Sequence, residues 1–467
     1  MNSVVQVNDT AEVDAIVDET DIRTTRHRSL LVLGLAGIAF EAFNLAVLSS
    51  GTSPMTGQLG LSANQVGLVS AYGYAATLVT AFTCGLLADR WGRVPLMVVA
   101  KFVTCVALLV MATAPGFGQL VLGRCLGGAG FGLDLGAAMA YLAEYLPRKR
   151  RHLLNFWQAQ WFLSTVIAIV VVLGLYHLDI GLSVWRWAMA AAGALALIVA
   201  FGQWAVLPES PKWLARAGKS AQLRRSLRVV YRIDATLPPE GLRVVRADTP
   251  AVRWRALFAA GLRSRTLFVN LLIMLVAITY YAVAYYLPVI GVVLFGRGYG
   301  QSLLGSIVFN LFGIVGGVCS VWIGRRFGAR SAALWGFLAA AAMLLVLGLL
   351  FHSLPVVLMF AVPALFIFCY AAGPGTASLT MAAMAYPSEL RGRGGQLSAV
   401  AQSLGGAVGL YLFPTLADAI GVPTTITIFA AAPLLGVLLC AIVRWEPFAV
   451  DAVPAPVARP NLIGEKR

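Results

Sequence analysis

Long apolar blocks alternate with short polar breaks along almost the whole chain. Most blocks hold about 20 or more residues, the length that a helix needs to cross a hydrocarbon core roughly 30 Å thick. They are continuous apolar runs and not the alternating ten-residue strands of a membrane barrel, so helices are the predicted spanning elements. Twelve spans are predicted, at residues 29–50, 64–88, 94–113, 119–143, 153–176, 184–206, 266–290, 302–324, 331–350, 355–383, 396–416 and 424–443.

The composition agrees with a membrane protein, and the charges indicate its topology. Of the 467 residues, 59% are hydrophobic and 12% are charged, which is far too apolar for a water-soluble globular protein. The net charge of +15 comes from basic residues that precede the first span or follow an even-numbered span, whereas the odd-numbered loops hold Arg297 and almost nothing else basic. By the positive-inside rule, both termini and the even-numbered loops are predicted to be cytoplasmic. We therefore predict no nucleic acid partner.

Polar segments divide the spans into two equal sets. The first 28 residues carry six acidic side chains and lack the regions of a cleavable signal, so a disordered tail is expected. The arginine-rich central stretch is expected to be a solvated linker with short surface helices. We predict an all-α membrane protein with twelve transmembrane helices in two six-helix bundles. Its segments are a cytoplasmic N-terminal tail (1–28), a first bundle (29–206), a central cytoplasmic loop (207–265), a second bundle (266–446) and a cytoplasmic C-terminal tail (447–467).

Two pairs of motifs recur at matching places in the two halves. GLLADRWGR (85–93) follows the second span, and VWIGRRFGAR (321–330) follows the eighth. AEYLPRKRR follows the fourth span and YPSELRGRG follows the tenth. Such matches indicate two parallel repeats of a transporter. Arg325 stands where the first half has Asp89, so the second loop is interpreted as degenerate.

The first of these loops resembles the signature of the major facilitator superfamily, G-x-L-x-D-R-x-G-R, at every fixed position. PESPKWL (208–214), AEYLPRKRR and YPSELRGRG are similar to marks of its sugar-porter branch and of metabolite:proton relatives, and Arg124 with Gly128 resembles its intramembrane arginine motif. The resemblance implies a 6+6 transporter whose cytoplasmic acids and bases bridge the halves; an exposed, solvated rim is the alternative. The implied gating residues are Gly85, Asp89, Arg90, Gly92, Arg93, Arg124, Glu144, Arg148, Arg151, Glu209, Glu389 and Arg391.

Four charged residues lie within predicted spans and away from the interface at which Arg186 is expected to anchor the sixth span; in the membrane a charge costs at least about 2.5 kcal/mol. They are Glu41, Lys101, Arg124 and Asp134. Asp134 precedes Glu144 by about 15 Å of helix, near mid-membrane. Its surroundings resemble the fourth span of phosphate:proton and metabolite:proton symporters, which implies roles in proton coupling and cargo binding. The alternative for Asp134 is a structural acid satisfied through Arg124 or Lys101.

The first and seventh spans supply further candidates. FEAFNL (40–45) resembles the first-span D-A-Y-D-L of the same symporters, with Glu41 and Asn44 at the acidic positions; Glu41 is a second proton-coupling candidate or a hydrogen-bonding neighbour of Asp134. The seventh span lacks the acid of phosphate symporters, which disfavours phosphate. Tyr281 and Tyr285 lie four residues apart, on one helical face, and are expected to stack on an organic ligand.

Other polar side chains in the spans serve either cargo binding or helix packing. Gln158, Gln160 and Trp161 fall near the place where sugar porters carry a ligand-binding glutamine, and Asn310 is the corresponding candidate in the eighth span. The six cysteines lie within spans as small apolar residues. The sequence indicates no metal site, no cofactor and no nucleophile constellation, so an enzyme is not expected.

We predict a proton-coupled symporter of the inner (plasma) membrane that imports a small polar metabolite, with an organic or aromatic acid favoured as cargo. Its partners are expected to be the small-molecule substrate, the proton and the lipid bilayer, and the chain is expected to be a monomer. A sugar:proton symporter or facilitator, a drug or metabolite:proton antiporter, and a nutrient-sensing membrane receptor are the alternatives.

Overall fold

The computed structural model describes residues 3–20, 25–145, 156–238, 242–243, 254–259, 261–295, 298–386 and 390–447. Within that part of the chain, twelve helical segments are long and apolar enough to cross a membrane. Each coincides with one of the predicted spans. The prediction of a mostly helical protein with twelve spans is therefore confirmed.

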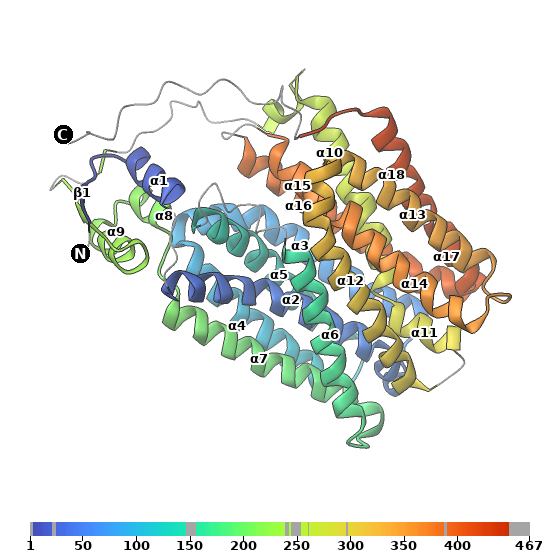
Figure 1. Cartoon of the computed structure of the whole chain (residues 1–467). Coiled ribbons are helices and arrows are strands. Elements are labelled where there is room, and N and C mark those ends of the chain that lie inside the picture. The colour runs from blue at the N-terminus through green and yellow to red at the C-terminus, as the bar shows by residue number, and fades with distance from the viewer. Residues whose placement is uncertain are drawn as a thin grey trace.

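The spans form two sets of six that lie side by side (Figure 1). Contacts of α3 with α16 and of α6 with α12 join the two sets, and π-helical turns interrupt the seventh and tenth spans. The first set comprises α2 (Thr25–Leu59), α3 (Ala63–Trp91), α4 (Arg93–Ala112), α5 (Phe117–Tyr145), α6 (Trp157–Tyr176) and α7 (Val184–Val206). The second comprises α10 (Arg263–Thr279), η5 (Tyr280–Ala284), α11 (Leu287–Phe295), α12 (Tyr299–Phe327), α13 (Ala329–Leu349), α14 (Val356–Tyr370), η6 (Ala371–Gly375), α15 (Thr376–Met384), α16 (Arg391–Ile420), α17 (Val422–Phe429) and α18 (Ala431–Ile442).

Single glycines connect α3 to α4 and α12 to α13. Gly92 has φ 103° and Gly328 has φ 84°, in a region that residues with a Cβ atom rarely adopt. A Cβ atom at either position would also collide with an acidic side chain, Glu209 beside Gly92 and Glu446 beside Gly328. The two tight turns thus depend on glycine for both backbone conformation and space.

A small domain made from the N-terminal segment and the central segment lies at one end of the first bundle (Figure 1). We call it the cap domain, and the end of the bundles at which it lies the cap end. Its two strands pair in parallel, and α1 packs against α8. Its elements are β1 (Ser3–Gln6), α1 (Thr10–Glu19), α8 (Pro211–Arg216), α9 (Ser220–Ser226), η3 (Leu227–Tyr231) and β2 (Ile233–Thr236).

The expectation of a disordered N-terminal tail is wrong for residues 3–20. Val7, Val13 and Val17 are completely buried in the cap domain, and burying each valine contributes roughly 1.5 kcal/mol or more. Two of the acidic residues that suggested disorder, Asp14 and Asp18, have basic partners in the central segment, as in the contact of Asp18 with Lys212 at 2.9 Å. The central segment is therefore not only a solvated linker, because it also docks the N-terminal residues.

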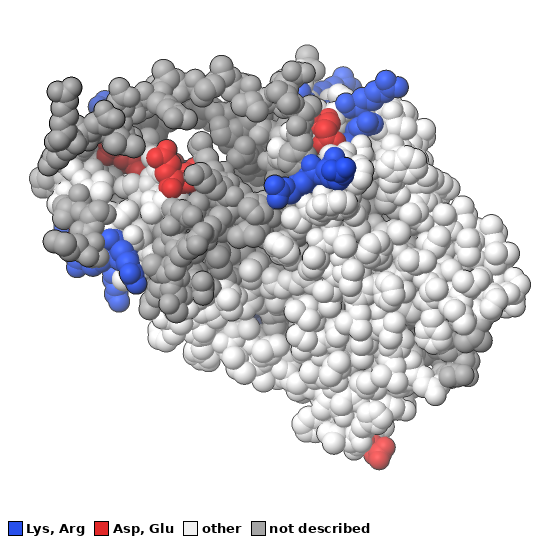
Figure 2. All heavy atoms as spheres, viewed as in Figure 1, with Lys and Arg blue, Asp and Glu red and all other residues white. Residues whose placement is uncertain are grey.

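The surface separates apolar from charged regions (Figure 2). Charged side chains gather along the cap domain and near the upper ends of α10 and α16, whereas the broad face over α12, α13 and α14 carries none in this view. Large apolar side chains on that face are solvent-exposed in the isolated chain, including Trp322, Trp335 and Val357. Such an apolar band fits contact with lipid.

Candidate transport site

Three charged side chains meet in the interior of the first bundle. Lys101 of α4 places its Nζ 2.6 Å from Glu41 Oε1 of α2 and 2.7 Å from Asp134 Oδ2 of α5. All three residues have 0% exposure. They lie about 12 to 14 Å along their helices from the cap end of each span, at a common depth. We call them the buried triad.

Small residues allow the helices that carry the triad to approach one another. A Cβ atom on Gly130 of α5 would lie 3.0 Å from the carbonyl oxygen of Ala100 in α4, which is tighter than ordinary packing. A Cβ atom on Gly37 of α2 would lie 3.5 Å from Asp134 Oδ2 and 2.9 Å from the amide nitrogen of Gln203 in α7. Glycine at these positions lets opposite charges from three helices reach hydrogen-bonding distance.

Each carboxylate keeps one oxygen for other interactions. Glu41 Oε2 and Asp134 Oδ1 are buried and accept no hydrogen bond from the described residues. Two buried carboxylates that share one ammonium carry a formal charge of about −1, which is costly in an apolar interior. Such a group gains from taking up a proton, because protonation neutralises it.

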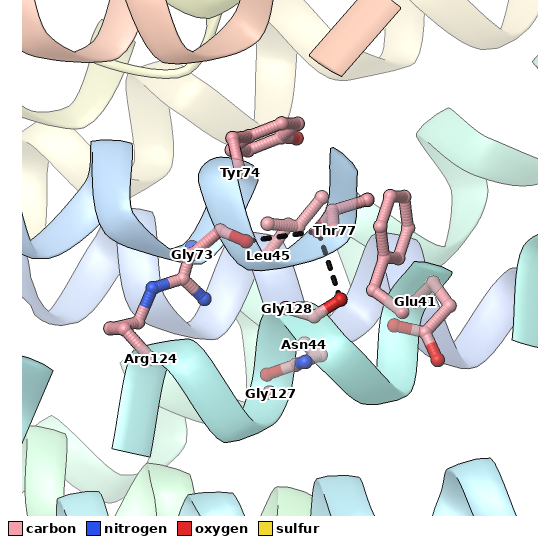
Figure 3. A pocket seen from close by; sticks show the side chains of 10 residues that line it. Glu41, Asn44, Leu45, Gly73, Tyr74, Thr77, Arg124, Gly127 and Gly128 are labelled. Atoms are coloured by element: carbon pink, nitrogen blue, oxygen red, sulfur yellow. Dashed lines mark hydrogen bonds between the residues drawn. The ribbon is translucent and has the colours of Figure 1, made fainter. Parts of the chain in front are cut away.

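Glu41 also lines a small cavity between α2, α3 and α5, with a volume of about 10 Å³, which is roughly the space that one water molecule needs (Figure 3). The hydroxyl of Thr77 donates to the carbonyl oxygens of Gly73 and Gly128, at 3.0 and 2.9 Å, and so ties α3 to α5 across the lining. Neither Lys101 nor Asp134 lines the cavity, so Glu41 connects it with the buried triad. The lining residues are Glu41, Asn44, Leu45, Gly73, Tyr74, Thr77, Arg124, Gly127, Gly128 and Phe131.

Arg124 brings a second charge to this cavity. It is 5% exposed, and within the described part of the chain it makes no ion pair. Its guanidinium lies against Gly73, where a Cβ atom would come within 2.7 Å. In Figure 3, Arg124 and Glu41 lie at opposite ends of the lining, with Asn44 between them. The cavity therefore presents a cation and a carboxylate to whatever enters it.

An aromatic cluster extends from the cavity to the second bundle. The ring of Tyr74, in the lining, lies 4.8 Å from that of Tyr281 in η5. Trp161 of α6 donates to the hydroxyl of Tyr280 at 2.9 Å, and Tyr280 stacks on Tyr370 at 5.4 Å. Tyr281 and Trp161 are thus joined through Tyr280, although the two come from different halves of the chain.

The remaining cargo candidates lie at varied places. Asn44 lines the cavity, whereas Tyr285, though buried, does not. Gln160 donates to the carbonyl oxygen of Leu35 at 2.7 Å, and Asn310 donates to that of Ser306 at 2.7 Å. Gln158 is buried in α6 at the contact with α12. Of this group, the structure brings only Asn44 to the cavity.

Several gating candidates converge where α3 turns into α4. Arg93 contacts Glu144 at 3.0 Å and Asp89 at 3.3 Å. Glu209 accepts a hydrogen bond from the amide of Val94 at 3.1 Å, at the start of α4, where a negative charge is favoured. Burial is the main cause that raises the pKa of Glu209 above its ordinary value. These contacts all lie within the first half of the chain.

The other gating candidates do not join this network. Gly85 faces Gln396 of α16 and lets the two halves approach, and Arg90 is exposed. Bridges between the halves therefore stay a prediction. Glu389, Arg148 and Arg151 lie outside the described residues, as does the side chain of Arg391.

Glu446 is a second acidic residue at a helix start, like Glu209, and the sequence analysis did not identify it. Its carboxylate accepts hydrogen bonds from the amides of Ala329 and Arg330, both at 2.9 Å, at the start of α13. It thereby repeats, in the second half, the contact of Glu209 with α4. The second turn lacks the equivalent of Asp89 but keeps this acid. The available signal was that each acid follows the sixth span of its half, in LPES and in RWEP.

Comparisons with known proteins agree with this architecture. The family described as "Sugar (and other) transporter" matches residues 29–447. The inner membrane metabolite transport protein YgcS of Escherichia coli is 25% identical over 424 residues, covering 90% of this chain and 91% of that protein. The arabinose-proton symporter of Bacillus subtilis is 25% identical over 443 residues, covering 89% and 93%. The xylose transporter XylE of Escherichia coli, in a partially occluded inward-open conformation, superposes with a TM-score of 0.72 at 19% identity, covering 90% of this chain and 99% of that one.

Proposed function

Because the chain belongs to the family of sugar (and other) transporters, whose members are membrane transporters, we propose that it is a proton-coupled symporter importing a small organic acid. It is a multi-pass protein of the inner (plasma) membrane. One observation carries the proposal: the same cavity is lined by Glu41, which belongs to the buried triad, and by Arg124, which has no acidic partner among the described residues.

The two charges of the cavity link proton binding to anion binding. While Glu41 is ionised, its negative charge opposes the entry of a carboxylate. Once Glu41 is protonated, Arg124 remains as a cation that favours one, and a guanidinium is well suited to bind a carboxylate. Thermodynamic linkage requires the reverse effect as well, so a bound carboxylate favours protonation of Glu41. This reciprocity is the requirement for symport.

Asn44 and the aromatic cluster give the cavity its selectivity. Asn44 adds an amide beside the two charges, and Tyr74 with Tyr281 forms an aromatic wall. Such a wall favours a flat or apolar body on the acid, because aromatic rings pack by stacking or edge contacts. The preferred cargo is accordingly an aromatic monocarboxylate.

We propose that transport proceeds by rocking of the two bundles about this cavity. At the end opposite the cap domain, the hydroxyl of Tyr299 donates to the carbonyl oxygen of Ser50 at 2.6 Å, and its ring meets that of Tyr176 at 5.3 Å. These contacts join the halves and must break when that end opens. The motif residues at the start of α4 are the proposed counterpart at the cap end, which is cytoplasmic by the positive-inside rule.

A sugar is the second candidate cargo. The relative named as an arabinose-proton symporter matches most of the chain, and tyrosine rings beside an asparagine amide also suit a pyranose. A neutral sugar makes no use of the unpaired charge of Arg124, so the charge of the cargo separates the two candidates.

Uptake by the purified protein in proteoliposomes tests the proposal. A pH gradient, acid outside, is imposed, and labelled acetate, lactate, benzoate, nicotinate, xylose and arabinose are compared. We expect a monocarboxylate, foremost benzoate or nicotinate, to be accumulated, and the accumulation to collapse with a protonophore. Liposomes without protein correct for permeation of the undissociated acids. Accumulation of a sugar alone would transfer the proposal to the second candidate, and uptake indifferent to the gradient would refute proton symport.

A further inference from the structure

A second cavity lies at the cap end of the second bundle, between α12, α13 and α15. Its volume is about 40 Å³, which is room for roughly three water molecules. The polar residues of its lining are Ser320, Arg325, Thr376 and Thr380, and the other lining residues are glycine, alanine and one valine. Because α12 packs closely on α14 and η6 but barely on α15, the two spans diverge where the cavity lies. We call it the cap-end cavity.

Small residues keep this cavity open and fix its wall. Gly324 of α12 belongs to the lining, and a Cβ atom there would meet nothing within 4 Å. On the opposite wall, α13 and η6 approach closely, because a Cβ atom on Gly373 would lie 2.7 Å from the carbonyl oxygen of Ala332 and 2.8 Å from the Cα atom of Gly336. The side of the cavity formed by α12 therefore has free space, whereas the side formed by α13 and η6 is tightly packed.

Arg325 brings a positive charge to the cap-end cavity and makes no ion pair within the described part of the chain. When the two loop motifs are aligned on their turn glycines, Arg325 stands at the place of Asp89. Ala329 likewise stands at the place of Arg93. The two first-half residues form an ion pair at 3.3 Å, whereas their two replacements both line the cavity. The second half thus has an unpaired cation beside open space where the first half has an ion pair.

Hydroxyl groups of the lining can serve as further donors to an anion. Ser320 and Thr380 donate to carbonyl oxygens within α12 and α15, at 2.7 and 3.1 Å. A carbonyl oxygen inside a helix also accepts the backbone N–H of the next turn. Each hydroxyl can therefore rotate toward an anion without leaving that carbonyl oxygen unpaired. Ser320 and Thr376 are buried, so the inner end of the cavity is shielded from solvent.

An exposed apolar stripe on α12 leads to Arg325. Its members recur every three or four residues and are 46 to 63% exposed: Leu311, Val315, Val318 and Trp322. Arg325 follows at the same spacing, two residues before α12 ends at Phe327. In a bilayer, the stripe would contact acyl chains, and Trp322 and Arg325 would lie near the headgroups, where tryptophan and arginine are favoured. The stripe therefore indicates that the cavity receives its ligand from the membrane.

From these observations we propose that the cap-end cavity binds the phosphate group of an anionic phospholipid from the leaflet at the cap end. Arg325 pairs with the phosphate, Ser320 and Thr380 donate to it, and the acyl chains lie along the stripe. A guanidinium suits this task because it can donate two parallel hydrogen bonds to a phosphate. Free phosphate offers the same chemistry without the acyl chains. The site is separate from the cargo cavity and does not depend on the proposed function.

The first test measures lipid binding to the purified protein in neutral detergent by native mass spectrometry. The probes are phosphatidylglycerol, phosphatidylcholine with the same acyl chains, and inorganic phosphate as a competitor. We expect phosphatidylglycerol to bind about fivefold more tightly than phosphatidylcholine, whose ammonium group is repelled by Arg325. Inorganic phosphate at the same concentration should not displace the lipid, because it lacks acyl chains. Displacement by free phosphate, or equal binding of the two lipids, would overturn the proposal.

Variants then locate the site. Arg325→Gln removes the cation and should weaken binding of phosphatidylglycerol about tenfold. Gly324→Leu fills the cavity, keeps the charge and should weaken binding by a similar factor. Thr380→Val, which preserves the shape of the side chain, should weaken it about threefold. Arg326→Gln is the matched control, because Arg326 is exposed next to Arg325 but does not line the cavity.

The control separates a defined site from general attraction between lipid and basic residues. Binding to Arg326→Gln should stay within about twofold of the unmodified protein, since a distant surface charge contributes little. Elution of each variant as a single species in detergent shows that it folds. Equal weakening by Arg325→Gln and Arg326→Gln would overturn the proposal, as would unchanged binding to both Gly324→Leu and Thr380→Val. No cargo enters this measurement, so its outcome is independent of whether a monocarboxylate is transported.

Discussion

The two bundles share a fold but differ in what they bury. In the described part of the chain, the charged residues that are buried within spans all belong to the first bundle, whereas the buried polar residues of the second are neutral. The second bundle contributes rings instead, among them Tyr280, Tyr281 and Tyr370. Under the proposed function, the contrast separates two tasks: the first half would hold the proton, and the second half would help to recognise the body of the cargo.

The two halves also differ at the cap end, although less strongly. Glu209 and Glu446 both accept hydrogen bonds at the start of a helix that follows a glycine turn. Among the described residues, however, only the first turn has an arginine paired with two acids, Asp89 and Glu144. The cap domain likewise packs on the first bundle. Both in the interior of the bundles and at the cap end, the first half therefore has more paired charged residues in the described part of the chain than the second half.

The largest predicted effect comes from the proton site. Glu41→Gln removes the titratable group that joins the cavity to the triad. A gradient of two pH units supports about 100-fold accumulation when one proton accompanies each cargo, and we expect this to fall to simple equilibration in the variant. Asn310→Ala, a buried polar change in the second bundle, is the matched control and should keep the coupling. Loss of coupling in both variants would contradict the division of tasks.

Substitution in the aromatic cluster should affect affinity and leave coupling intact. Tyr281→Ala removes the ring that faces Tyr74 at 4.8 Å, and aromatic contacts of this kind contribute about 0.5 to 1.5 kcal/mol. We expect KM for the aromatic acid to rise about tenfold with an unchanged pH dependence, measured as initial uptake rates. A change in the pH profile would place the second bundle in proton coupling as well.

The paired helix starts should respond equally to loss of their acids. Glu209→Ala and Glu446→Ala each leave amides without an acceptor at the start of α4 or α13. Each change is expected to lower stability by about 0.5 to 2 kcal/mol, read as a fall in the thermal transition in detergent. If Glu446→Ala left the transition unchanged while Glu209→Ala lowered it, the proposed equivalence of the two turns would be wrong.

A smaller effect is expected at the cap domain. Asp18→Asn weakens the pair with Lys212, in which both side chains are 10% exposed. The N-terminal segment should dock less firmly by about 0.5 to 1 kcal/mol, seen as faster proteolysis within residues 3–20. The exposed Glu19→Gln is the control and should leave the rate unchanged. Equal cleavage of all three proteins would show that the ion pair does not hold the segment.

The smallest predicted effect is the pH dependence of stability that Glu209 causes. Burial raises the pKa of Glu209, so the folded state binds this proton more tightly than the unfolded state does. The resulting stabilisation is complete below the ordinary value of 4.5 and is lost as the pH rises through the folded pKa. Relative to Glu209→Gln, the thermal transition of the unmodified protein should therefore decline by about 1 to 2 °C between pH 4.5 and 8. An opposite slope would mean that the helix start outweighs burial.

Much of the fold could be predicted from the sequence. The spans are encoded locally, because about 20 consecutive apolar residues leave the chain few alternatives in a bilayer. Charged residues within a span can also be recognised from the sequence, because placing a charge in the membrane costs free energy. Glu41, Lys101, Arg124 and Asp134 were all recognised in this way. The sequence left open whether Arg124 or Lys101 pairs with Asp134, and the structure pairs Asp134 with Lys101. That choice depends on which faces of α2, α4 and α5 meet, and the close contacts at Gly37 and Gly130 help to decide it.

One error and one omission of the sequence analysis have a common physical origin. The N-terminal segment looked disordered because its acids were considered without Lys212, which lies almost 200 residues away. Glu446 was missed because it comes from a distant part of the chain and not from the motif itself, which, as interpreted, has Arg325 in the place of Asp89. A local sequence pattern indicates which structures a segment can form, and contacts with residues far along the chain determine which of them it forms.

The most direct test of the central claim is the ratio of protons to cargo molecules entering proteoliposomes. It can be measured in one sample with an internal pH-sensitive dye and a labelled monocarboxylate. We predict a ratio of about one for the unmodified protein and close to zero for Glu41→Gln, with Asn310→Ala again near one. A ratio that stays at one in Glu41→Gln would contradict the assignment of the proton to the first bundle.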